Sequence, residues 1–232
     1  MKTTRTYQLP SFLANPKLYL KLRYLLGYMF DVANIQAKEV EDEELMKKYA
    51  WVVYSWDVEI IEPIKIFDQI RITTFAIKMN KFYAYRNFII EKNGKIVVKA
   101  YCVFLLIDIE RLRPAKIPEE LEKAYGNEKS VYNGRKIDFE DDFEKEETLQ
   151  IRRADIDLNL HVNNAAYLDL IENLSQISDQ DVAYFKIIYK NEIRNKDFVK
   201  GFVKNKKDSS EFKLVSEEGK VYTYGKIIKR DV

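Results

Sequence analysis

The sequence predicts an α+β protein built from two similar halves, each a long helix packed on a curved antiparallel sheet. Apolar residues recur at helical spacing twice, over residues 18–33 and 167–177, and strand-like segments come after each of them. Two hairpin glycines, Gly94 and Gly219, lie 125 residues apart near the ends of the two series. With 232 residues, 47% of them hydrophobic, the chain can bury one face of each helix and each sheet.

The first half is expected to begin with an extended piece over residues 7–12. A helix should start at Asn15-Pro16, because Asn caps helices and Pro suits their first turn. Its apolar face consists of Leu18, Leu22, Leu25, Leu26, Met29 and Ala33. Segments rich in aromatic and β-branched residues predict strands over 51–61, 70–79, 82–91 and 95–108, with a tight hairpin at Asn93-Gly94.

The middle of the chain predicts a connecting segment. Proline and glycine interrupt residues 111–147, and seven acids occur over 138–147. A short helix is expected over 119–125. The predicted division is an N-terminal half over residues 1–125, an acidic linker over 126–147 and a C-terminal half over 148–232.

The second half repeats the plan of the first. An extended piece over 148–156 leads into a helix whose apolar positions are Tyr167, Leu168, Ile171, Leu174 and Ile177. Strands are expected over 182–189, 198–204, 211–216 and 220–229, with a turn at Glu218-Gly219.

Composition removes several classes of function. The single Cys102 excludes an internal disulfide and multi-cysteine metal sites, and the single His161 excludes multi-histidine metal sites. We therefore expect no metal, and no cofactor. Lys and Arg number 39 against 37 Asp and Glu, a balance that does not suggest a nucleic-acid partner. The longest apolar stretch, residues 101–107, is too short to span a membrane, and no signal segment is evident, so a cytoplasmic protein is expected.

Polar residues gather where the second half enters its helix. If the segment is extended, Asp157, Asn159 and His161 share one face, while the apolar residues between them point inward. Asn163 or Asn164 is expected to cap the helix, whose free N–H groups could hold an oxyanion. The same residue types are also common in caps and turns, so the pattern alone leaves a structural role open.

The string from Asp157 to Tyr167 resembles the DxNxHVNNxxY signature of acyl-acyl-carrier-protein (acyl-ACP) thioesterases, which have a tandem, or double, hotdog fold. Its residues are Asp157, Asn159, His161, Val162, Asn163, Asn164 and Tyr167. Weaker similarities occur in the expected order at Trp51-Val52-Val53, Phe82–Phe88, Arg111-Leu112-Arg113 and Ile117-Pro118.

The resemblance implies roles for individual residues. Asp157, Asn159 and His161 match three catalytic positions, and Glu192 matches a further carboxylate. Ile193 stands where many members have Cys, and Cys102 lies in an apolar strand of the other half, so a thiol nucleophile is disfavoured. We expect Glu192, assisted by His161, to activate water. Asn159 would orient the imidazole or the substrate carbonyl, and Asp157 would fix the loop or attack to form an anhydride.

The resemblance also implies a substrate and a partner. The expected reaction is hydrolysis of fatty acyl-ACP to free fatty acid and holo-carrier, ending fatty acid synthesis. Leu25, Leu26, Met29 and Phe30 would line the acyl channel. The basic run over 186–207, including Lys200 and Lys204, would dock the acidic carrier.

Three alternatives are an acyl-CoA thioesterase, a hotdog dehydratase and a non-catalytic acyl-thioester-binding module. The complete polar set argues against the binding module. The two halves could pair within a monomer, or the chain could form a homodimer.

Overall fold

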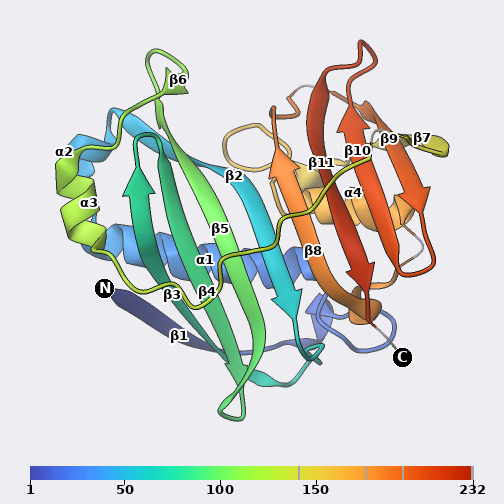
Figure 1. Cartoon of the computed structure of the whole chain (residues 1–232), viewed down its shortest axis with the longest axis horizontal. Coiled ribbons are helices and arrows are strands. Elements are labelled where there is room, and N and C mark those ends of the chain that lie inside the picture. The colour runs from blue at the N-terminus through green and yellow to red at the C-terminus, as the bar shows by residue number, and fades with distance from the viewer. Residues whose placement is uncertain (141, 176, 195, 231–232) are drawn as a thin grey trace.

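The computed structural model describes residues 1–140, 142–175, 177–194 and 196–230. Its long strands form a continuous antiparallel sheet in the order β1-β3-β4-β5-β2-β8-β11-β10-β9-β7, and helices α1 and α4 lie along one face of it (Figure 1). The strands of the first half are β1 (Lys2–Gln8), β2 (Tyr49–Ile60), β3 (Gln69–Asn80), β4 (Tyr83–Lys92), β5 (Lys95–Asp108) and the short β6 (Arg113–Pro114). Those of the second are β7 (Lys145–Gln150), β8 (Val182–Tyr189), β9 (Phe198–Asn205), β10 (Ser209–Val215) and β11 (Val221–Lys229). The helices are α1 (Leu22–Val40), α2 (Glu43–Met46), α3 (Glu119–Tyr125) and α4 (Ala166–Leu174).

The two halves have the same plan and join edge to edge. In each half a first strand leads to a helix and then to a set of antiparallel strands, so β1, α1 and β2 correspond to β7, α4 and β8. The junction pairs Ser55–Glu59 of β2 with Tyr184–Ile188 of β8. The predicted tandem α+β architecture is confirmed.

The core lies between the sheet and the two helices. Alternate strand residues such as Trp56, Phe185 and Phe212 point toward the helices and are fully buried. Met29 of α1 and Ile171 of α4 are buried in the same cluster. One hydrophobic core therefore unites the halves, as it does within a single domain.

The opposite face of the sheet is crossed by the segment between the halves, which runs over β4, β5, β2 and β8 toward β10 (Figure 1). The buried Asn87 side chain accepts hydrogen bonds from Val131 N and Tyr132 N of this segment. The buried carboxylate of Asp57 accepts from the Tyr132 hydroxyl at 2.7 Å and from Arg135 N at 2.8 Å. This connecting segment, which lies between α3 and β7, is thus fixed to the sheet, and we call it the strap.

Several element boundaries differ from expectation, among them β7, which covers Lys145–Gln150 where an extended piece is expected over 148–156. The first strand ends at Gln8 and does not cover residues 7–12, and α1 begins at Leu22 instead of at Asn15-Pro16. Asn15 caps a tight turn, because its side-chain oxygen accepts from Lys17 N and Tyr19 N. In the second half, α4 stops at Leu174, so Ile177 lies beyond the helix but is still buried.

Candidate active site

A large cavity opens where the two half-sheets diverge. β2 pairs with β8 only over Ser55–Glu59. The residues that precede this pairing in β2, Trp51–Tyr54, and those that follow it at the end of β8, Tyr189–Glu192, line a cavity of about 1190 Å3. Its wall also includes α1 and the loop that leads into α4. All four candidate residues face it: Asp157, Asn159, His161 and Glu192.

The loop that carries three of these residues is a tight turn, and the expected extended segment is wrong. Asp157 N donates to the carbonyl of His161 at 2.8 Å, and Leu160 has a positive φ of 60°. One carboxylate oxygen of Asp157 accepts from Asn159 N at 2.8 Å and from His161 N at 3.2 Å. Asp157 therefore folds the loop by capturing N–H groups that a strand would have used.

The apolar residues of the loop consequently do not all point inward. Val162 is buried as expected, but Ile156 is exposed, Leu158 is fully exposed and Leu160 is 73% exposed. The expected cap is also different, since α4 starts at Ala166 and the Asn163 side chain accepts from Ala165 N just before it.

His161 and Glu192 approach each other across the cavity wall. Nδ1 of His161 lies 3.6 Å from Oε1 of Glu192, whose other oxygen binds Arg194 at 2.6 Å. Behind them, Val162 N donates to the carbonyl of Ile193, and Ile193 N donates to the Tyr167 hydroxyl. These bonds attach the histidine loop to the segment that carries Glu192.

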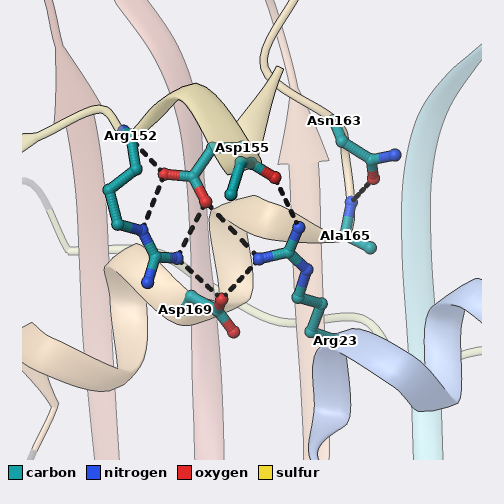
Figure 2. A network of polar contacts seen from close by, with 7 residues as sticks. Arg23, Arg152, Asp155, Asn163, Ala165 and Asp169 are labelled. Atoms are coloured by element: carbon teal, nitrogen blue, oxygen red, sulfur yellow. Dashed lines mark hydrogen bonds and ion pairs between the residues drawn. The ribbon is translucent and has the colours of Figure 1, made fainter. Parts of the chain in front are cut away.

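A second network fixes the same loop to the rest of the molecule (Figure 2). The fully buried Asp155 accepts from Arg152 at 2.8 Å and from Arg23 of α1 at 3.4 Å, while Asp169 of α4 accepts from Arg23 at 2.7 Å and from Arg152 at 3.0 Å. Burial acts to raise the pKa of Asp155, but its hydrogen bonds from Arg152 and the nearby positive charges outweigh it and lower that pKa. The two guanidinium groups thereby balance the two carboxylates.

Sequence reasoning missed Arg23, which lies 132 residues before Asp155 and carries no local signal for this contact. Arg152 carries no cap signal either, because a guanidinium cannot accept a hydrogen bond; the turn is closed by Arg152 N donating to the Asp155 side chain and Asp155 N donating to the Arg152 carbonyl. Cys102 lies where expected: it is fully buried in β5, and burial raises the pKa of its thiol well above the usual value.

The channel wall differs from the prediction. Phe30 lines the cavity, but Leu25, Leu26 and Met29 are buried in the core. The side of α1 that faces the cavity carries Gly27, Asp31 and Asn34, which recur at helical spacing on an exposed face.

The basic run over 186–207 is split by the fold. Lys200 and Lys204 of β9 lie within 3.0 Å of Glu146 of β7 and Glu140 of the strap, respectively. Lys190, Arg194 and Lys196 line the large cavity instead. The run therefore does not form one basic face.

The histidine loop has a structural twin in the first half. Asn15 N donates to the carbonyl of Tyr19 at 2.8 Å, as Asp157 N does to His161, and Leu18 has the same left-handed backbone as Leu160. The backbone of Tyr19 forms an isolated antiparallel β-bridge with Lys65 of the next loop, as the backbone of His161 does with Arg194. The twin therefore preserves the backbone of the loop and its contact.

The chemistry of the twin is different. Lys17, Tyr19 and Pro63 occupy the places of Asn159, His161 and Glu192. The loop after α4 also fills the space, since Gln180 accepts from Asn15 and Asp179 accepts from Leu22 N. A cavity of only about 10 Å3 is left there.

Comparisons with known proteins agree with this architecture. The family model described as the acyl-ACP thioesterase N-terminal domain matches residues 1–125, and the one for the C-terminal domain matches residues 139–229. The chain belongs to the acyl-ACP thioesterase family. As a member, it is a thioester hydrolase acting on fatty acyl-ACP, and its fold is the tandem hotdog.

Solved structures of similar fold include an acyl-ACP thioesterase from Bacteroides thetaiotaomicron, with 18% identity, a TM-score of 0.88 and coverage of 99% of this chain and 98% of that one. A 12:0-ACP thioesterase from Umbellularia californica has 18% identity, a TM-score of 0.85 and coverage of 99% and 97%. A putative oleoyl thioesterase from Lactobacillus plantarum has 18% identity, a TM-score of 0.85 and coverage of 100% and 97%. No curated protein matches the sequence.

Within the described ranges, this thioesterase has no helix that is both long and apolar enough to cross a membrane.

Proposed function

We propose that this acyl-ACP thioesterase hydrolyses its substrate with Glu192 and His161 as the groups that activate water. The observation that carries the proposal is their approach to 3.6 Å on the wall of the large cavity. Such a separation is long for a direct hydrogen bond, and catalytic contacts commonly tighten when substrate binds. Water would lose a proton to this pair as its oxygen attacks the thioester carbonyl, and the thiolate would then leave.

Asn159 and Asp157 have supporting roles in this proposal. No group among the described residues hydrogen-bonds the side-chain amide of Asn159, which favours donation to the substrate carbonyl over orientation of the imidazole. Asp157 accepts two backbone N–H groups of its own loop, which favours the loop-fixing role over attack on the carbonyl.

The acyl chain would extend from these residues toward Phe30, Trp51 and Phe104, the apolar part of the cavity wall. We also propose the division into halves over 1–125 and 148–232 with a linker over 126–147. The family models, which end at 125 and resume at 139, support it, although β7 already begins at Lys145. The cytoplasmic location stays a prediction, and so do the two association states, monomer and homodimer.

The test compares variants of the two loops. We expect His161→Ala and Glu192→Gln to lower kcat for free-thiol release by about 100-fold or more, while circular dichroism stays native. Tyr19→Ala, at the twin position of His161, serves as the matched control and should keep wild-type kcat. Wild-type rates in folded His161 and Glu192 variants would refute the assignment.

A second measurement separates the roles of Asp157. In a single turnover in heavy-oxygen water, an anhydride that water opens at the Asp157 carbonyl leaves the label in the peptide that contains Asp157, whereas direct attack by water on the thioester leaves it in the fatty acid. We expect the peptide to stay unlabelled. Comparing kcat/KM on acyl-ACP and acyl-CoA then distinguishes the two thioesterase alternatives.

A further inference from the structure

The rim of the catalytic cavity exposes leucines that add nothing to the core. Leu112 lines the cavity, is 77% exposed and has a positive φ of 50°. Leu158 and Leu160 alternate along the histidine loop with Asp157, Asn159 and His161, which line the cavity, and both leucines are exposed. An exposed leucine gains no burial on folding, so these three side chains are available to an apolar partner.

Cations without close acidic partners accompany the leucines. Lys190 and Lys220 line the cavity, are exposed, and have no carboxylate within ion-pairing distance among the described residues. Among the residues that the structure describes, the carboxylate that Lys196 approaches is that of Glu218, at 3.9 Å. On β9, by contrast, Lys204 lies at 3.0 Å from Glu140 and 2.9 Å from Asp142.

We propose that this rim, defined as Leu112, Leu158, Leu160, Lys190, Lys196 and Lys220, is the docking surface for the carrier protein. It rests on the proposed function, in which the tethered thioester must reach Glu192 from outside. An acidic carrier surface with a few apolar side chains matches lysines without close acidic partners around exposed leucines, and its arm would enter the cavity that the rim surrounds.

The charges argue against another docking surface, β9, and against another partner, anionic lipid. The lysines of β9 are already neutralised by acids of the strap and β7, so they attract an acidic protein less. Anionic lipid would also attract lysines and leucines, but it would have to approach Glu218 and Glu192, which are exposed at the same rim.

The experiment measures kcat/KM for one acyl group presented on the carrier protein and on pantetheine, and takes the ratio of the two values. We expect this ratio to fall about tenfold or more in the double variant Lys196→Glu/Lys220→Glu and in Leu112→Asp, because docking is lost while the small thioester still enters. The wild-type ratio should also fall as salt is raised. Matched controls are Lys200→Glu on β9 and Leu18→Asp, the twin of Leu160, which should leave the ratio unchanged.

Each other outcome overturns the proposal. An unchanged ratio in both rim variants removes the rim as the docking surface, and a fall in Lys200→Glu alone places the carrier on β9. Cosedimentation with phosphatidylglycerol vesicles that the rim variants abolish, with an unchanged ratio, assigns the rim to a membrane. Wild-type protein that hydrolyses neither thioester refutes the proposed function itself, and the docking proposal with it.

Discussion

Individual carboxylates hold the histidine loop in place, and each accepts hydrogen bonds from different groups. Asp157 shapes the histidine loop through two N–H groups, and Asp155 is held by Arg152 and Arg23. The sequence pattern and the family resemblance named four residues that the fold brings to the wall of one cavity, but the pattern predicted the wrong backbone. Apolar and polar residues alternate over 156–162 as in a strand, yet a side chain that captures two N–H groups overrides that pattern.

Asp179 leads to a prediction about pH at the same scale. Burial and the neighbouring Glu172 raise the pKa of Asp179 from 3.8 to about 6. A raised pKa means that the folded state binds the proton of Asp179 more tightly than the unfolded state does. Protonation of Asp179 therefore stabilises the folded state, and this stabilisation is fully present below pH 3.8 and is lost as pH rises through 6. Asp179→Asn should therefore increase the free energy of unfolding at pH 7.5 by about 3 kcal/mol, and have little effect near pH 4.

Urea unfolding of both proteins across this pH range measures the difference. The asparagine oxygen can still accept from Leu22 N, so the variant keeps that contact. A variant that is no more stable than wild type at pH 7.5 would contradict the prediction.

Among the elements, α1 differs most from its counterpart. It has 19 residues against 9 in α4, and its far portion borders the large cavity. The periodicity of Leu18 to Ala33 predicted the helix and its core face from Leu22 on, but not its start, because Leu18 lies before the helix and is exposed. The reason is that Asn15, which also suits a helix cap, folds a turn here and leaves Lys21 as the cap.

Gly27 in the exposed side of α1 offers a stability test. A Cβ there meets no atom within 4 Å, and its φ is not positive, so alanine fits. Gly27→Ala should raise the free energy of unfolding by about 0.5–1 kcal/mol through helix propensity. Gly225→Ala is the contrasting control, because its Cβ would overlap the carbonyl oxygen of Lys186, and it should destabilise the protein. Equal effects of the two substitutions on thermal unfolding would refute this account.

The contact from α1 to the histidine loop gives a further prediction. Arg23 binds Asp169 at 2.7 Å and donates to the carbonyl of Ala154 at 3.0 Å, next to Asp155. Arg23→Gln should lower kcat about tenfold with little change in KM, since the loop that carries His161 loses an anchor. Arg5→Gln, at an exposed pair with Glu39, is the control and should keep both constants. A changed KM with unchanged kcat would contradict a positioning role for Arg23.

At the scale of the whole molecule, Asp57 connects all three parts of the chain. It belongs to β2 and accepts from Tyr132 and Arg135 of the strap, and from Tyr184 of β8 at 2.7 Å. The order of elements predicted the duplicated fold, because hydrophobic periodicity is local. Neither the β2–β8 junction nor the course of the strap could be predicted, because both depend on contacts between residues more than 40 positions apart.

This connection predicts a large effect on stability. Asp57→Leu should lower the free energy of unfolding by about 3 kcal/mol, because two tyrosine hydroxyls and Arg135 N lose their buried acceptor. Urea unfolding measures it. Glu59→Gln, two residues along β2 in a half-exposed pair with Arg135, is the control and should cost less than about 1 kcal/mol. Similar costs for the two substitutions would show that the strap contributes little.

The twin loop, which has Tyr19 in the place of His161, has a consequence for how the sequence of such a protein can vary. In a homodimer of identical hotdogs, every substitution appears twice, so the two copies cannot differ in helix length or in the loop after the helix. Here one copy keeps His161 and an open cavity, while the other has Tyr19 and a loop that fills the same space. Because the two halves here are parts of one chain, each can carry its own residues, and that symmetry does not apply. Residues that fill one half can therefore vary without closing the other.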